Sequence, residues 1–401
     1  MKQHWKKNTL LFLSSQTISL FGSSLVQYAI TWHITLKTQS GLMMAISIIC
    51  GFLPMFFISP FAGVWADRYN RKMIIILSDS LIAISTLALV ILFSQGNDAL
   101  WLLFVASAIR SIGSSFQTPA ISAFLPQLVP EDKLVKVNAA NGSIQALVML
   151  ASPMLSGALL TVASIERIFL IDVITAIIAI VFLVFIKAEI HAKALEKQTT
   201  SYFTDMKEGI IYIRNHPFIK NFLIFCAIFM ILASPVAFLT PIQVTRTYGE
   251  DVWRLTTIEI TFSIGMMLGG LIMATWGGFK NKIYSMTLAC MVVGLCTFLL
   301  GVIPNFIIYS ALMGIFGASM PLFNTPSTVL LQEKVEEGYL GRVFSVMSMI
   351  SSIMMPLGML VFGPVADIIK IEWLLIGTGV LLFILSFYLV GSKTLLEAGK
   401  G

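Results

Sequence analysis

The stretch "GVWADRYNRK", residues 63–72, gathers charge in a chain that otherwise carries little. Asp67, Arg68, Arg71 and Lys72 fall within six residues, and long apolar runs lie on both sides. Only 11% of the 401 residues are charged, 57% are hydrophobic, and the mean hydropathy is +0.90. A soluble domain carries about 25% charged residues, so the composition indicates an integral membrane protein. Residues 63–72 then form a charged turn between two membrane-spanning segments.

Twelve segments of the chain are apolar over the length of about 20 residues that a spanning helix needs. The first continues to about Trp32, which favours a spanning helix over a signal peptide. We expect spans at roughly 9–35, 42–66, 73–94, 100–125, 138–162, 168–187, 221–243, 255–277, 283–303, 305–330, 342–363 and 372–391.

The distribution of Lys and Arg sets the orientation, because these residues favour cytoplasmic loops. With the N-terminus inside, 20 of the 26 fall in inside segments, 5 in outside segments, and Arg110 within a span. We therefore expect a multi-pass protein of the cell (cytoplasmic) membrane with both termini cytoplasmic. The net charge of +6 then reflects membrane orientation and not binding to nucleic acid.

The two halves of the sequence echo each other. "FQTP" at 116–119 recurs as "FNTP" at 323–326, and "WADRYNRK" at 65–72 lines up with "WGGFKNKI" at 276–283. This repetition predicts an all-α membrane protein of twelve transmembrane helices in two six-helix, pseudo-repeated halves, 1–187 and 221–401. Repeated halves are a known build for transporters, with the binding site between them near mid-membrane.

The halves are joined by the longest polar stretch, the predicted cytoplasmic linker 188–220. Phe203, Met206, Ile210 and Ile213 recur there at helical spacing, which predicts an amphipathic helix on the cytoplasmic membrane surface. A solvated linker with incidental apolar residues is the alternative.

The charged turn resembles a motif of the major facilitator superfamily, G-x-x-x-D-R-x-x-R-K/R, found between helices 2 and 3. Gly63, Asp67, Arg68, Arg71 and Lys72 occupy its positions. Asn70 stands where glycine is usual, and asparagine also tolerates left-handed backbone. The resemblance covers essentially the whole chain and implies the fold of that family.

Two further motifs extend the resemblance. "RSIG" at 110–113 resembles the helix 4 motif, with Arg110 and Gly113 in place. "SPMLSG" at 152–157 resembles a degraded helix 5 antiporter motif, since Ser152 and Ser156 replace the usual glycines and weaken the case for antiport. "YLGRVFSV" at 339–346 and the overall run resemble the macrolide-efflux branch.

The resemblance implies that the charged turn works as a conformational latch. In the family helix 2 lies beside helix 11, whose N-terminus we expect near Gly341. Gly63 would let the two helices come close, and Asp67 would face the partial positive charge of that N-terminus. An ordinary positive-inside turn is the alternative. "GPVAD" at 363–367 looks similar, but "IIKIE" follows it, so we expect no latch role there.

Four ionisable residues, Asp79, Arg110, Asp172 and Glu259, fall within predicted spans, where a charge costs roughly 2.5–3.5 kcal/mol. They are candidates for proton coupling. We expect Asp79 to neutralise Arg110. The alternative for Asp79 and Asp172 is that they only fix helix packing.

Polar residues that share a face of the first helix are candidates for the substrate cavity. The candidates are Gln16, Ser19, Ser23 and Gln27, together with Gln117 and Asn324. The chain also has 21 Met and 29 Phe residues, and flexible Met surfaces accept varied ligands. This combination favours an uncharged or cationic amphipathic substrate.

The resemblance implies a secondary active transporter that exports a lipophilic or amphipathic, macrolide-like drug by proton antiport and confers antibiotic resistance. Alternatives are an exporter of an endogenous metabolite such as a siderophore, and a non-antiport facilitator or importer. An enzyme is not expected, because the four histidines form no metal spacing and "GSKT" at 391–394 lacks the upstream glycine of a phosphate-binding loop. We expect no cofactor or metal, the proton gradient as energy source, and a monomer whose partners are the small-molecule substrate and the bilayer.

Overall fold

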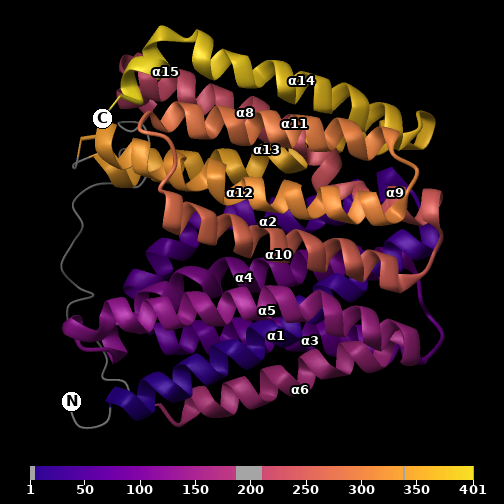
Figure 1. The fold of residues 1–401 in the computed structure, drawn as a ribbon. Helices are drawn as coiled ribbons and strands as arrows, with labels where there is room; N and C mark the ends of the chain where they lie inside the picture. Colours follow the sequence, from indigo (N-terminus) through magenta and orange to yellow (C-terminus); the bar gives the residue numbers. More distant parts are fainter. Residues whose placement is uncertain (1–4, 187–209, 337–338, 401) are drawn as a thin grey trace. The chain divides into compact units, whose positions relative to one another are not determined.

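The computed structural model describes residues 5–186, 210–336 and 339–400, which are helical apart from short connections and contain no strand. They form two units (Figure 1). The first unit comprises Met1–Ile34 and Ile46–Gln198, and the second comprises Thr35–Ala45 and Thr199–Gly401. Two described helices therefore cross the division: Trp5–Thr38 ends in the second unit, and Gly41–Arg68 begins there and continues in the first.

Six long helices carry the first half of the chain. They are α1 (Trp5–Thr38), α2 (Gly41–Arg68), α3 (Arg71–Ser94), α4 (Leu100–Leu128), α5 (Leu134–Val162) and α6 (Ile165–Val184), with a short 3-10 turn, η1 (Glu131–Lys133), before α5. Within the first unit α3 packs against both α4 and α6. Because α3 contacts both α4 and α6, polar side chains of these three helices lie close together.

Helices α8 to α15 make up most of the second half. They are α8 (Pro217–Phe238), α9 (Thr240–Tyr248), α10 (Val252–Trp276), α11 (Lys282–Val302), α12 (Phe306–Lys334), α13 (Leu340–Ile368), α14 (Ile371–Gly391) and α15 (Lys393–Ala398). α8 and α9 are separated by Leu239 and follow each other in one apolar segment, Pro217–Tyr248. α10 packs on α12, α11 on α14, and α8 on α13.

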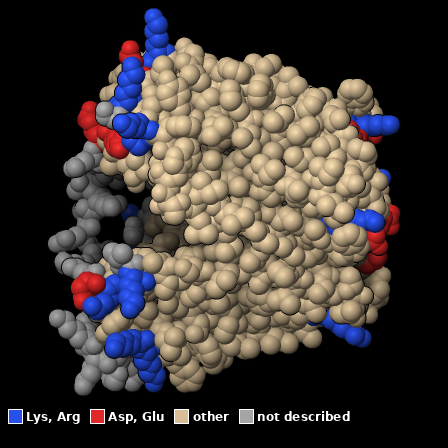
Figure 2. Space-filling model, in the orientation of Figure 1, with Lys and Arg blue, Asp and Glu red and all other residues tan. Residues whose placement is uncertain are grey.

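Eleven segments among the described residues are long and apolar enough to cross a membrane. α4 is not among them, because Arg110, Gln117 and several serines lower its hydropathy. With α4 included, each of the twelve predicted spans overlaps one of these segments, which confirms the predicted all-α membrane fold. On the face shown in Figure 2, charged side chains gather at the helix ends and the wide middle of each unit carries none.

Asparagine side chains start the helices that follow two matching turns. Asn70 has an extended backbone (φ −65°, ψ 108°), and its side chain accepts a hydrogen bond from the Met73 amide. Asn281 does the same for the Ile283 amide at the start of α11. Asn70 is therefore not in the left-handed conformation that asparagine tolerates, and it serves here as a helix cap.

Candidate functional site

A buried ion pair lies at the centre of the first unit. Arg110 on α4 is 5% exposed and Asp172 on α6 is 1% exposed, and Arg110 Nη1 donates a hydrogen bond to Asp172 Oδ2. Nη1 also reaches Thr86 Oγ1 at 2.6 Å, and Nη2 donates to the Ser23 carbonyl oxygen at 3.0 Å. The pair thus joins α1, α3, α4 and α6.

Both carboxylate oxygens of Asp172 are used. Ser23 Oγ donates to Oδ1 at 3.1 Å, and Thr86 Oγ1 donates to Oδ2 at 2.8 Å. The prediction that Asp79 neutralises Arg110 is therefore wrong. Thr86, the residue of α3 that Arg110 contacts, lies two helical turns beyond Asp79, or about 10 Å along the axis.

Asp79 belongs to a second buried cluster. Its Oδ1 accepts hydrogen bonds from Ser19 Oγ at 2.6 Å and from Gln117 Nε2 at 2.7 Å. Its Oδ2 is buried and has no hydrogen-bond partner among the described residues. A buried charged oxygen without a partner is costly, so this atom is well suited to hold a proton.

Gly113 brings α4 close to α3 beside these clusters. A Cβ added there would lie 2.7 Å from Ile82 Cγ1 and 3.2 Å from the Ser78 carbonyl oxygen. Glycine thus permits the close helix contact.

A cavity of about 340 Å³ opens beside Asp79 between α1, α4 and α5. Four predicted candidates line it: Gln16, Ser19, Ser23 and Gln117. Ser19 and Gln117 both face this cavity and donate to Asp79. They are therefore a direct link between the cavity and the carboxylate.

The sequence interpretation missed a third polar wall, from α5. Asn138, Asn141 and Gln145 line the same cavity. Their spacing of three and four residues places them on one helix face, and this signal was available in the sequence. No ionisable side chain is among the described residues that line the cavity.

The other candidates lie elsewhere. Gln27 is exposed on α1 and does not line the cavity. Asn324, exposed on α12, and Glu259, partly buried on α10, belong to the second unit. Ser156 replaces a motif glycine and donates to the Leu25 carbonyl oxygen of α1 at 3.1 Å, while Ser152 is fully buried.

The charged turn has contacts within the first unit that the sequence did not predict. Arg71 donates to the carbonyl oxygens of Ala66 and Ala123, both at 2.9 Å. Lys72 Nζ donates to those of Val184 and Ile186, at 2.9 and 2.8 Å. Cations at the C-terminal carbonyl groups of helices are stabilising, so both residues tie helix ends together.

The remaining residues of the predicted latch are Asp67, Arg68, Gly63 and Gly341. Arg68 is exposed, and the side chain of Asp67 lies outside the described residues. A Cβ added at Gly63 or at Gly341 would meet no atom within 4 Å. The expected approach of helix 11 to Gly63 stays a prediction, because Gly63 belongs to the first unit and Gly341 to the second.

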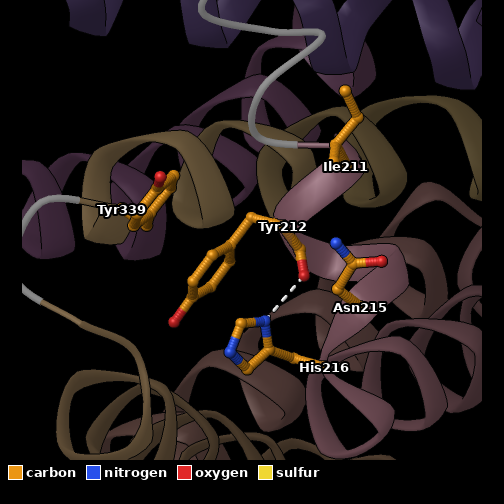
Figure 3. A pocket seen from close by; sticks show the side chains of 5 residues that line it. All are labelled: Ile211, Tyr212, Asn215, His216 and Tyr339. Atoms are coloured by element: carbon orange, nitrogen blue, oxygen red, sulfur yellow. Dashed lines mark hydrogen bonds between the residues drawn. The ribbon is translucent and has the colours of Figure 1, made fainter.

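A smaller hollow of about 190 Å³ lies in the second unit where the chain enters α8 (Figure 3). The ring of Tyr212 stacks on that of Tyr339, with centroids 4.1 Å apart, and His216 lies beside it at 3.9 Å. Residues 210–215 are helical, and their buried side chain is Tyr212, whereas Ile210 is exposed. Phe203 and Met206 of the predicted amphipathic helix lie outside the described residues.

Comparison with known proteins gives consistent matches. The sequence profile of the Major Facilitator Superfamily matches residues 11–359. Macrolide efflux protein A of Streptococcus pyogenes is 30% identical over 376 residues, 93% of each chain. The protein of that name in Enterococcus faecalis is 30% identical over 322 residues, 80% of this chain and 99% of that one. The crystal structure of a bacterial homolog of the human lysosomal transporter Spinster gives a TM-score of 0.72 at 14% identity, covering 99% of both chains.

Proposed function

Because the chain belongs to the Major Facilitator Superfamily, a family of membrane transporters and not of enzymes, we propose that it exports a macrolide-like drug in exchange for protons. The similarity to Macrolide efflux protein A supports the substrate class. The contact of Ser19 and Gln117 with both the cavity and Asp79 is the observation that carries the coupling to protons.

The lining of the cavity favours a substrate rich in oxygen atoms and poor in charge. Its polar groups are hydroxyls and carboxamides, which both donate and accept hydrogen bonds. Recognition of a phosphate or a dicarboxylate would call for arginine or lysine, and the described lining has neither. The volume of about 340 Å³ is within the range of small-molecule sites.

Asp79 is the best-placed proton carrier of the first unit. The carboxylate of Asp172 is held by Arg110, Thr86 and Ser23, so its charge is compensated. Both described hydrogen-bond donors to Asp79 are neutral, and its Oδ2 has no hydrogen-bond partner among the described residues. Ser19 and Gln117 connect the cavity to this carboxylate, so a substrate that contacts them can change the protonation of Asp79. Exchange requires that the bound substrate favour loss of the proton, because linkage is reciprocal.

The exchange would be driven by the membrane potential and the pH gradient, with both termini in the cytoplasm and one chain as the working unit. A proton that moves inward through 100 mV releases about 2.3 kcal/mol. At about 1.4 kcal/mol per tenfold, one proton per neutral substrate supports a concentration ratio of less than about a hundredfold. In this scheme Asp67 closes the cytoplasmic side, and Glu259 is a second candidate to carry a proton.

The proposal is tested with purified protein in liposomes loaded with a pH-sensitive dye. We expect a macrolide to drive proton movement and an imposed pH gradient to drive uphill macrolide transport. Asp79→Asn should abolish both, while Asp132→Asn, the same change at an exposed carboxylate, should abolish neither. Uphill transport that needs sodium and no pH gradient would overturn the coupling to protons. If none of several macrolides is transported, the proposed substrate class is wrong.

A further inference from the structure

The motif "GPVAD" ends in Asp367, whose carboxylate accepts hydrogen bonds from the first turn of α2. Oδ1 accepts a hydrogen bond from the Gly41 amide at 2.8 Å, and Oδ2 accepts from the Leu42 amide at 2.9 Å and from Ser40 Oγ at 2.7 Å. A carboxylate at the positive end of a helix is stabilising. The sequence interpretation gave this motif no role because no basic cluster follows it in the chain.

The basic residue that pairs with Asp367 lies on another helix. Arg246 on α9 donates to Asp367 Oδ1 at 3.0 Å and to the Ala366 carbonyl oxygen at 2.7 Å. It also donates to the carbonyl oxygen of Gln39, which has φ +47°, an uncommon backbone conformation outside glycine. One guanidinium therefore holds both the end of α13 and the turn that precedes α2.

Small residues bring the two helices into direct backbone contact at this point. A Cβ added at Gly41 would lie 2.2 Å from the Gly363 carbonyl oxygen. A Cβ added at Gly363 would lie 2.7 Å from that of Ala45. The first turn of α2 is thus fixed to α13 by shape as well as by charge.

These contacts all lie within the second unit, to which residues 35–45 belong, whereas α2 from Ile46 onward belongs to the first unit. A transporter cycle that rearranges the units must act on this helix. Either the first turn of α2 detaches, or α2 bends near Gly51 and Pro54. We propose that Asp367, Arg246 and the first turn of α2 form an outer catch that opens and recloses in each transport cycle.

The contacts of the outer catch are polar, which favours detachment of the first turn of α2 from α13 over bending of α2. The side chains of Asp367 and Arg246 are 30% and 32% exposed. Water can therefore replace each of their hydrogen bonds, and exposed ion pairs are weak. The outer catch also lies on the side of the membrane that the Lys and Arg distribution predicts to be external.

A reversible cross-link tests whether the outer catch must open. Ser40→Cys with Asp367→Cys, in a Cys50→Ala background, places two thiols where Ser40 Oγ and Asp367 Oδ2 are 2.7 Å apart. We expect oxidation to stop transport and a reductant to restore it. The matched control is Thr247→Cys with Glu372→Cys, whose parent oxygens are 3.1 Å apart in the same unit without involving α2. Transport by the oxidised catch pair at the rate of the oxidised control would overturn the proposal.

A second measurement needs no transported substrate and is therefore independent of the proposed function. Met44→Cys places a thiol at a position of α2 that is 2% exposed. In this background Asp367→Asn should speed labelling by an impermeant maleimide about tenfold, equivalent to about 1.4 kcal/mol, because charge-assisted hydrogen bonds are lost. Glu372→Gln should leave the labelling rate unchanged. Equal labelling with and without Asp367→Asn would show that Asp367 does not hold the first turn of α2 in place, and would refute the proposal whatever the drug assays give.

Discussion

Replacing Asp172 with asparagine removes the charge opposite Arg110 while keeping the size of the side chain. The three donors around the carboxylate decide how the new amide sits. Arg110 and Thr86 both donate toward Oδ2, whereas only the Ser23 hydroxyl donates toward Oδ1. The amide oxygen will therefore face Arg110, and the Ser23 hydroxyl can rotate to accept from the amide nitrogen. The substitution then deletes the charge and little else.

The expected loss of stability follows from burial. Removal of one partner from a buried ion pair costs about 3–5 kcal/mol, because the other charge is left uncompensated. Asp172 and Arg110 are 1% and 5% exposed, which places the pair in this class. Since asparagine keeps an acceptor for Arg110, we expect the lower end, about 3 kcal/mol. The exposed pair of Asp132 and Lys133, with side chains 70% and 50% exposed, is the control; Asp132→Asn should cost less than about 1 kcal/mol.

Thermal unfolding in detergent can be followed through the protein's own thiols. Cys226, Cys290 and Cys296 are buried, so a thiol-reactive dye reports unfolding. Asp172→Asn should melt well below the parent protein. Arg110→Met with Asp172→Leu should recover stability, because apolar replacement of a buried pair is often neutral or favourable. The reasoning is refuted if Asp172→Asn melts with the parent, or if the double variant is less stable than Asp172→Asn.

Three further predictions concern the first unit. Asp79→Asn, which imitates the protonated carboxyl, should retain downhill exchange of substrate but lose the pH dependence of efflux, as measured by counterflow of labelled drug. Lys72→Met should lower stability by about 1 kcal/mol through loss of two hydrogen bonds to carbonyl oxygens, with Lys133→Met as the exposed control. Gly113→Val should cost at least about 1–3 kcal/mol by overpacking against Ile82, whereas the same change at Gly142, which has open space around it, should not.

Hydropathy predicted the helices well because spanning a bilayer imposes length and composition on each segment separately. The polar face of α1 predicted most of its cavity residues for the same reason, since Gln16, Ser19 and Ser23 share one face of a single helix. The hydrogen-bond partners of the buried charges could not be predicted from single helices in this way. Arg110 binds Asp172 and not Asp79, a choice set by how α3, α4 and α6 pack, and spacing along one helix does not contain that information.

Asp79 and Asp172, the buried carboxylates described in the first unit, look equivalent in sequence. Their neighbours differ, and we therefore assign them different roles. Asp172 has a cation and two hydroxyl donors, so it can remain charged and fix four helices. Asp79 has two neutral donors and an oxygen without a described partner, so its charge is the less stabilised. Both neutral donors also face the cavity. Ser23 also lines the cavity and donates to Asp172, so a ligand there can contact a donor of either carboxylate. The difference lies in the charge: Arg110 compensates that of Asp172, whereas the described donors to Asp79 are both neutral, so we expect the ligand to act on the protonation of Asp79.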